Sequence, residues 1–223
     1  MRLQLPPTSI YLITDRQAFR HRPETTEGEM RHAQLEAIAR AAQAGCPLIQ
    51  IREKDLPARA LCEFIRAAIT RARPHGAKVL INDRLDVALA TGADGVHLRV
   101  TSLPVTLVRQ TADQRGRRDF LLGVSTHSLG EAQMAEAGGA DFIVCGPVYD
   151  TPSKRAYGTL LGIEQFAEIC RAVKLPVFAL GGIELDNCFE PLRRGAAGIA
   201  AIRLFTDLHT LSQSVKTILA HRH

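Results

Sequence analysis

Apolar runs of strand length alternate along this chain with segments of helical periodicity, and this alternation constrains the fold more than any other feature. Val, Ile, Leu and Ala dominate the runs, and a small-residue turn such as TGADG or GGAD leads into several of them. Strands that alternate with helices are typical of βαβ units, which form parallel sheets. The eight predicted strands lie at residues 9–14, 47–53, 77–82, 95–99, 120–125, 141–146, 176–181 and 198–203.

This pattern predicts an α/β fold, a single-domain (β/α)8 TIM barrel over residues 1–223. The length of 223 residues suits such a barrel, which typically has about 250 residues. Segment 29–45 has apolar residues at spacings of three and four, which predicts a helix with Gly45 at its carboxyl end. The polar segment 21–28 is expected to be a loop after the first strand, where it could act as a lid.

Composition excludes several classes of protein. No apolar run reaches the roughly 18 residues of a membrane span, so we expect no membrane partner and a cytoplasmic location. The five cysteines are odd in number and lack CxxC spacing, which argues against a disulfide framework or a zinc site. The net charge of +5 is dispersed, and only segment 109–119 is locally basic. We expect a solvated loop there, no nucleic-acid partner, and phosphorylated small molecules as ligands.

Polar residues follow several predicted strands at their carboxyl ends, which open on one face of a parallel barrel. In IREKD, Arg52 and Lys54 are two residues apart, so both side chains can point to one side and bind an anion. Surface ion pairs of these cations with Glu53 or Asp55 are the alternative. The sequence therefore predicts an anion site at the mouth or, failing that, a local ion pair.

The next strand ends in INDR, which places an amide oxygen and a carboxylate side by side. Asp83 is a natural Mg²⁺ ligand, and magnesium commonly lies between one or two carboxylates and substrate phosphates. Asn82 and Asp83 could equally form a turn or a helix cap. The proximity of Arg52 and Lys54 favours the metal hypothesis.

The segment GVSTHS places three polar residues where the fifth strand gives way to a helix. Ser128 followed by Glu131 indicates a capping box, so Ser128 is interpreted as structural. Ser125 and His127 are the candidates for chemistry, and His127 can exchange protons near neutral pH. A structural hydrogen bond is the alternative role for His127.

Three further segments carry candidate binding groups. The loop GPVYDTPSK contains Thr151, Ser153 and Lys154, which suit a diphosphate but would also fit an ordinary surface loop. Gly181 and Gly182 follow the seventh strand and AAIRLF follows the eighth, where barrels often hold a phosphate on backbone NH groups. Plain turns are the alternative for these glycines.

Taken together, the chain from YLITD to IAAIRLF resembles the thiamine phosphate synthase family and its sister group, the thiazole tautomerases. IQIREKD, INDRLDVALATGADGVHL, GVSTHS and GPVYDTPSK occur in this order and carry the resemblance. The resemblance implies a barrel that joins 4-amino-5-hydroxymethyl-2-methylpyrimidine diphosphate to a thiazole phosphate in thiamine biosynthesis. Pyrophosphate is released, and Mg²⁺ is the implied cofactor.

The same resemblance implies roles for individual residues. Asp83 would ligate Mg²⁺, and Ser125 would assist departure of the diphosphate. The remaining residues would bind the two substrates through charge, hydroxyl groups or backbone NH groups. Those for the diphosphate are Arg52, Lys54, Asn82 and Lys154, and those for the thiazole phosphate are Thr151, Ser153, Gly182, Ile202 and Arg203.

Two departures from the family pattern keep other functions open. Synthases usually continue G-Q-x-D after GVHL, and this Asp is their second magnesium ligand, whereas the chain reads RVTSLP at 99–104. Arg203 stands where a serine is usual. A thiazole tautomerase would need no diphosphate metal and would use His127 as its acid or base.

A third alternative is a catalytically silent barrel that binds thiamine-related phosphates and regulates a partner. The synthase is favoured because the REK, NDR and TPSK segments are retained. The sequence is compatible with a homo-oligomer but does not determine the oligomeric state.

Overall fold

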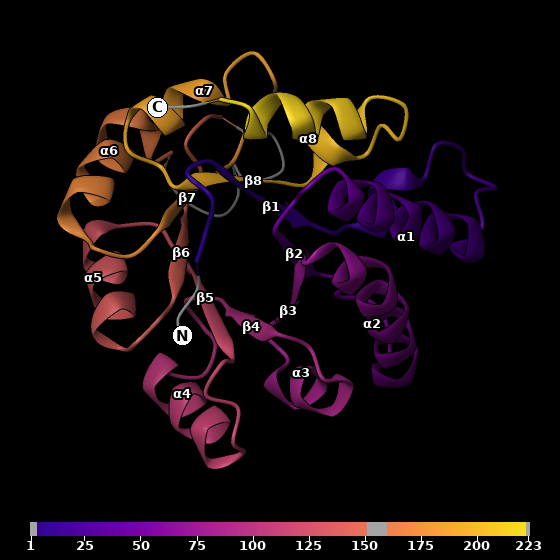
Figure 1. Cartoon of the computed structure of the whole chain (residues 1–223), viewed down its shortest axis with the longest axis horizontal. Coiled ribbons are helices and arrows are strands. Elements are labelled where there is room, and N and C mark those ends of the chain that lie inside the picture. Colours follow the sequence, from indigo (N-terminus) through magenta and orange to yellow (C-terminus); the bar gives the residue numbers. More distant parts are fainter. Residues whose placement is uncertain (1–3, 151–159, 222–223) are drawn as a thin grey trace.

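The computed structural model describes residues 4–150 and 160–221, which form a closed barrel of parallel strands inside a ring of helices (Figure 1). Strand β1 pairs in parallel with both β2 and β8, and this pairing closes the barrel. The expected (β/α)8 TIM barrel is therefore confirmed. The strands are β1 Ser9–Ile13, β2 Leu48–Ile51, β3 Lys78–Asn82, β4 Gly95–Leu98, β5 Leu121–Thr126, β6 Phe142–Cys145, β7 Val177–Leu180 and β8 Gly198–Ala201.

A helix follows each strand and packs on the outside of the barrel. The last predicted strand is shorter than expected, because the residues after Ala201 turn into the 3-10 helix η4 (Arg203–Phe205). Two other 3-10 helices are η1 (Arg16–Phe19) and η2 (Arg73–His75). The α-helices are α1 Glu27–Gln43, α2 Ala58–Ala72, α3 Leu85–Thr91, α4 Val105–Gln114, α5 Leu129–Ala137, α6 Gly162–Ala172, α7 Phe189–Arg193 and α8 Leu211–Leu219.

Helix α1 shows how local signals set the element boundaries. Thr26 caps the helix by accepting a hydrogen bond from the amide of Glu29, whose carboxylate in turn accepts from the amide of Thr26. This capping box starts the helix at Glu27, so the last two residues of the predicted loop 21–28 are helical. Gly45 has φ +102° just beyond the end of the helix, as predicted for a glycine at this position.

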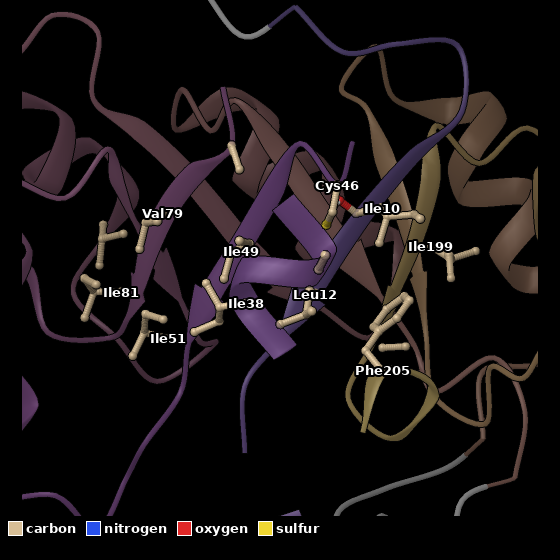
Figure 2. Packing of buried hydrophobic residues seen from close by; sticks show 14 of the residues in the cluster. Ile10, Leu12, Ile38, Cys46, Ile49, Ile51, Val79, Ile81, Ile199 and Phe205 are labelled. Carbon is tan, nitrogen blue, oxygen red and sulfur yellow. The ribbon is translucent and has the colours of Figure 1, made fainter. Parts of the chain in front are cut away.

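The core has two layers because successive side chains of a strand point to opposite faces. Ile10 and Leu12 of β1 pack outward against helix α1, where Figure 2 shows Ile38 beside Leu12 and Ile49. Tyr11, between them in sequence, points into the barrel and packs against Phe142 at a ring distance of 5.2 Å. The same alternation sends the residues at the strand ends either into the mouth or towards the helices.

The basic segment 109–119 was expected to be a solvated loop, and this expectation is wrong for its first half. Residues 109–114 belong to α4, which buries Val108 and Ala112 at helical spacing. The Arg109 guanidinium donates to the Asp141 carboxylate at 2.6 Å and to the carbonyl of Phe120 at 2.7 Å. Arg109 thus holds the start of β5 to the start of β6.

No helix within residues 4–150 and 160–221 is long and apolar enough to cross a membrane. All five cysteines are free thiols, and Cys46, Cys145 and Cys188 are buried.

Candidate active site

The carboxyl ends of the strands bring most of the predicted residues to one mouth. Arg52, Asn82 and Ser125 continue the inward-pointing positions of β2, β3 and β5, in step with Leu48, Leu80 and Leu121 of the inner core. Asn82 lies opposite His97 in the β3–β4 pairing. Thr151, Ser153 and Lys154 lie outside the described residues.

The buried guanidinium of Arg16 pairs with the two acidic residues of IREKD and not with its two basic residues. The Arg16 side chain is 3% exposed and donates from Nη1 to Glu53 at 3.0 Å and to Asp55 at 2.6 Å. Its Nε contacts Glu27 at the start of α1. We call Arg16, Glu27, Glu53 and Asp55 the Arg16 cluster. Its formation means that the alternative of ion pairs between Arg52 or Lys54 and these neighbours is wrong.

Burial lowers the pKa of Arg16, but its hydrogen bonds with Asp55, Glu27 and Glu53 outweigh this effect and raise the pKa above the ordinary value. Arg16 is therefore a permanent cation. Asp55 responds in the opposite direction, because the hydrogen bond from Arg16 lowers the pKa of its carboxyl group. The cluster fixes the loop after β1 to the loop after β2 and turns Arg52 and Lys54 to the other side.

Three cations gather on that other side. Burial lowers the pKa of Lys54, and the nearby charges of Arg52 and Arg99 lower it further. Arg99 follows β4 and was not among the residues predicted for the site. We call Arg52, Lys54 and Arg99 with the carboxylate of Asp83 the mouth cluster. Three positive charges near one another repel each other. An anion that binds between them relieves this repulsion, so the group attracts anions.

Asp83 has the single positive φ (+63°) found at a non-glycine residue in the described chain, a conformation that Asp tolerates better than most residues. Its amide donates to the carbonyl of His97 at 2.8 Å, which ties the end of β3 to β4. One carboxylate oxygen accepts from the Ser102 hydroxyl and the other from Nη2 of Arg99. Burial raises the pKa of this carboxyl group, but the hydrogen bonds from Ser102 and Arg99 prevail and lower it.

These contacts do not fit the magnesium ligand that the resemblance implied. Both oxygens of Asp83 already have partners, and one partner is a cation. Within the described ranges, no group of three or more His, Cys, Asp or Glu side chains could hold a metal ion. The donor set at this point suits an arginine rather than a divalent cation.

A buried hydrogen-bond chain leads from the barrel interior to Ser125. Nε2 of Gln50 donates to the hydroxyl of Tyr11 at 3.2 Å, and this hydroxyl lies 3.3 Å from Nδ1 of His97. Nε2 of His97 lies 2.9 Å from the Ser125 hydroxyl. The buried Tyr11 proton needs an acceptor, which Nδ1 supplies, so Nε2 carries the imidazole proton and donates it to Ser125.

Burial keeps this chain uncharged. It lowers the pKa of His97 to about 3 and raises the pKa of Tyr11 beyond its ordinary range. Space for the imidazole exists because residue 123 is a glycine: a Cβ there would lie 2.7 Å from Nδ1 of His97 and 2.5 Å from Phe142. Since Ser125 accepts from His97, its own proton is left to donate towards the mouth.

Sequence reasoning missed His97, although the sequence contained a signal. A histidine stands in the apolar strand GVHL, two residues before a basic strand end. By alternation it faces inward, where a buried imidazole needs partners. Only the pairing of β4 with β5 reveals that its partner is Ser125.

His127 lies on the exposed rim beyond Ser125. Its Nδ1 lies 2.5 Å from the carbonyl of Gly146, so Nδ1 carries a proton and Nε2 is directed elsewhere. Ser128 caps α5 by accepting from the amide of Glu131, as predicted. The Glu131 carboxylate, however, accepts from the amide of His127 instead of closing the box on Ser128.

The two glycines after β7 pack tightly against the loop after β6. A Cβ on Gly181 would lie 2.6 Å from Pro147, and one on Gly182 would lie 2.6 Å from Tyr149, and both residues have positive φ. Tyr149 also donates its amide to the carbonyl of Gly181 at 3.0 Å. Ile202 and Arg203 lie at the start of η4, after the adjacent strand.

Comparisons with known proteins agree with this architecture. A family model described as thiamine monophosphate synthase matches residues 10–205. A protein of Geobacter sulfurreducens is 47% identical over 194 residues, which cover 87% of this chain and 84% of that protein. A thiamine-phosphate synthase of Roseiflexus sp. (strain RS-1) is 38% identical and is matched over 86% of this chain and 76% of its own length.

A solved structure gives the same result in three dimensions. The thiamine phosphate pyrophosphorylase from Pyrococcus furiosus superposes with a TM-score of 0.75 at 32% sequence identity. The superposition covers 96% of this chain and 98% of the other. From the matched family model, the relatives and the shared barrel, the chain belongs to the thiamine monophosphate synthase family.

Proposed function

We propose that this chain is a thiamine-phosphate synthase, which joins 4-amino-5-hydroxymethyl-2-methylpyrimidine diphosphate to a thiazole phosphate. The observation that carries the proposal is the mouth cluster, whose cations Arg52, Lys54 and Arg99 lie at the strand ends that also bear Ser125. A diphosphate carries more charge than a single phosphate and matches such a group of cations. The relatives named thiamine-phosphate synthase support the same activity.

In the proposed reaction the bond between the pyrimidine methylene carbon and the diphosphate oxygen breaks. The electron pair leaves with pyrophosphate, and the electron-rich pyrimidine stabilises the resulting carbocation. The thiazole nitrogen then supplies the electron pair of the new C–N bond. The protein's task is to stabilise the charge of the leaving group and to aim the thiazole nitrogen at the cation.

Ser125 has the central role in this proposal. Its hydroxyl accepts from Nε2 of His97 at 2.9 Å, which leaves its proton free to donate to the departing diphosphate. Arg52, Lys54 and Asn82 would hold that group from the neighbouring strand ends. Lys154 is proposed to bind the same group.

The thiazole phosphate would bind on the other side of the mouth. Backbone NH groups at Gly182, Ile202 and Arg203 would take its phosphate, and Thr151 and Ser153 would contact it from the preceding loop. The tight packing of Gly181 and Gly182 against Pro147 and Tyr149 supports a fixed backbone there. The proposal includes one domain over residues 1–223 and a cytoplasmic location.

A test needs purified chain, the two substrates and a direct measurement of thiamine phosphate. We expect product, and we expect Ser125→Ala to lower kcat by about 100-fold or more, as removal of a donor to a developing charge does in other enzymes. Ser128→Ala is the matched control, because it removes a helix cap and should cost about 1 kcal/mol of stability with kcat preserved.

Three results would contradict the proposal. Full activity of Ser125→Ala would remove its central residue. Isomerisation of a thiazole phosphate tautomer without any coupling would instead support the tautomerase with His127, and ligand binding without turnover would support the regulatory barrel. The names of the compared relatives favour neither alternative.

A further inference from the structure

We propose that Arg99 binds the substrate diphosphate in place of a metal ion, and that Asp83 positions its guanidinium. The inference rests on the proposed function, since the diphosphate is the group that departs in that reaction. It assigns Arg99 to substrate binding and makes Asp83 a positioning residue instead of a metal ligand.

The carboxylate of Asp83 is closed off by its partners. The Ser102 hydroxyl accepts from the amide of Arg99 at 2.8 Å and donates to one oxygen of Asp83, while the Arg99 side chain donates to the other. The three residues thus form a ring that fixes the turn after β4. A divalent ion would have to displace a hydroxyl and a guanidinium in order to reach the carboxylate.

Arg99 and Ser102 occupy two positions of the family pattern that accompanies the second magnesium ligand. In the family pattern G-Q-x-D after GVHL, the second carboxylate stands four residues beyond the leucine, and Ser102 holds that place here. The first residue of the same pattern, a glycine, is replaced by Arg99. One carboxylate is therefore lost and one guanidinium is gained within the same four residues.

This exchange of a carboxylate for a guanidinium preserves the net charge of the site. A divalent cation held by two carboxylates is formally neutral as a group, and so is the pair of Arg99 and Asp83. In both cases Arg52 and Lys54 supply the net positive charge that attracts the anion. The exchange also preserves chemistry, because a guanidinium offers several N–H donors in a planar fork that matches phosphate oxygens.

The guanidinium of Arg99 is placed to reach a ligand. Its side chain is half exposed, and Nη2 is the atom that contacts Asp83. The other N–H groups of the guanidinium can face the anion together with Arg52 and Lys54. Asp83 is itself fixed by the hydrogen bond that its backbone amide donates to the carbonyl of His97. The guanidinium of Arg99 that Asp83 holds therefore has little conformational freedom to lose on binding.

The experiment measures binding of inorganic pyrophosphate by isothermal titration calorimetry, once in EDTA and once with saturating Mg²⁺. We expect binding in EDTA, with less than a threefold change in Kd when magnesium is present. Arg99→Gln should weaken binding in EDTA by about 10- to 100-fold, as expected for loss of a charge-assisted hydrogen bond. Arg71→Gln is the matched control, because it removes one exposed positive charge from the last turn of α2 and should leave Kd unchanged.

Asp83→Asn separates a positioning role from a ligand role. Asn tolerates the positive φ of this residue, and its amide oxygen can still accept a hydrogen bond from Arg99. We therefore expect pyrophosphate to bind to this variant within about threefold of the unaltered chain. An essential metal ligand would not tolerate loss of its charge in this way.

Pyrophosphate binding that requires magnesium would overturn the inference, and so would full binding by Arg99→Gln. The comparison of pyrophosphate binding with and without magnesium uses the unaltered chain. It therefore tests the inference even if a variant does not fold. The thiamine phosphate assay separates this inference from the proposed function. Product that forms only with magnesium refutes the inference alone, whereas metal-independent pyrophosphate binding without any product refutes the function alone.

Discussion

Two charged clusters at the same end of the barrel have opposite compositions. The Arg16 cluster surrounds one buried cation with three carboxylates, whereas the mouth cluster has three cations and one carboxylate, which pairs with Arg99. Arg16 and Glu53 are almost completely buried, but Lys54 and Arg99 are exposed at the rim. The difference agrees with a structural role for the first cluster and with the ligand-binding role proposed for the second.

The comparison also explains how one short segment serves both purposes. Residues 52–55 alternate in sign, and the Arg16 cluster takes the two acidic residues, Glu53 and Asp55. Arg52 and Lys54 are consequently left without a neutralising partner from their own segment. Because the Arg16 cluster takes up these two carboxylates, an excess of positive charge remains next to it.

The largest effect should follow from breaking the Arg16 cluster. Arg16→Ala leaves the buried carboxylate of Glu53 without its cation, so we expect the free energy of unfolding to fall by about 3–5 kcal/mol. Urea denaturation measures this change. Arg20→Ala is the control, since its exposed side chain bonds to Gln17 and its loss should change stability by less than about 0.5 kcal/mol. A loss below about 1 kcal/mol for Arg16→Ala would refute the structural role.

The opposite result is expected for the mouth cluster. Arg52→Ala should weaken pyrophosphate binding by about 10- to 100-fold, while stability changes by less than about 0.5 kcal/mol. Calorimetry measures the change in pyrophosphate affinity, and urea denaturation of the same sample measures the change in stability. If Arg52→Ala unfolded the protein as readily as Arg16→Ala, the distinction between the two clusters would be lost.

The pH dependence of folding stability distinguishes the two clusters from the buried imidazole of His97. Asp55 and Asp83 titrate below the ordinary carboxyl pKa of 3.8, so they stay charged between pH 7 and 5. His97 takes up a proton at about pH 6.5 when unfolded but only at about pH 3 when folded, because burial disfavours its charge. The unfolded chain therefore binds more protons in this window, and stability falls as the pH falls.

The contribution of His97 to this loss should be about 2 kcal/mol between pH 7 and pH 5. Urea denaturation at both pH values measures it, with His97→Gln as the comparison, because glutamine cannot take up the proton. The loss of stability should be smaller in His97→Gln by this amount. An equal loss of stability between pH 7 and pH 5 in the two proteins would show that the imidazole is not held neutral.

The smallest effect concerns the metal. Ser102→Asp restores a second carboxylate beside Asp83, so magnesium should tighten pyrophosphate binding about tenfold in this variant, against less than threefold in the unaltered chain. Ser102→Ala is the matched control, since it removes the hydroxyl without adding charge. The idea of an arginine substitute would be weakened if Ser102→Asp showed no gain from magnesium.

Local patterns in the sequence were sufficient for the fold and for much of the mouth. The alternation of strands and helices predicted the barrel, and the shared face of parallel strand ends predicted that Arg52, Asn82 and Ser125 lie at one mouth. Thr26 with Glu29 and Ser128 with Glu131 set helix starts through contacts three residues apart. Such features are visible in sequence because the residues that make them are close along the chain.

The partners of these residues depended on the tertiary structure. Arg16 meets Glu53 across 37 positions, and His97 meets Ser125 across 28. Asp83 meets Ser102 across 19 positions, which changed its interpretation from a metal ligand to an acceptor for Arg99. The sequence by itself determined which chemical groups stand at the strand ends. Only closure of the barrel decided which groups meet, because the pairing and register of β1 to β5 bring together residues that no local pattern connects.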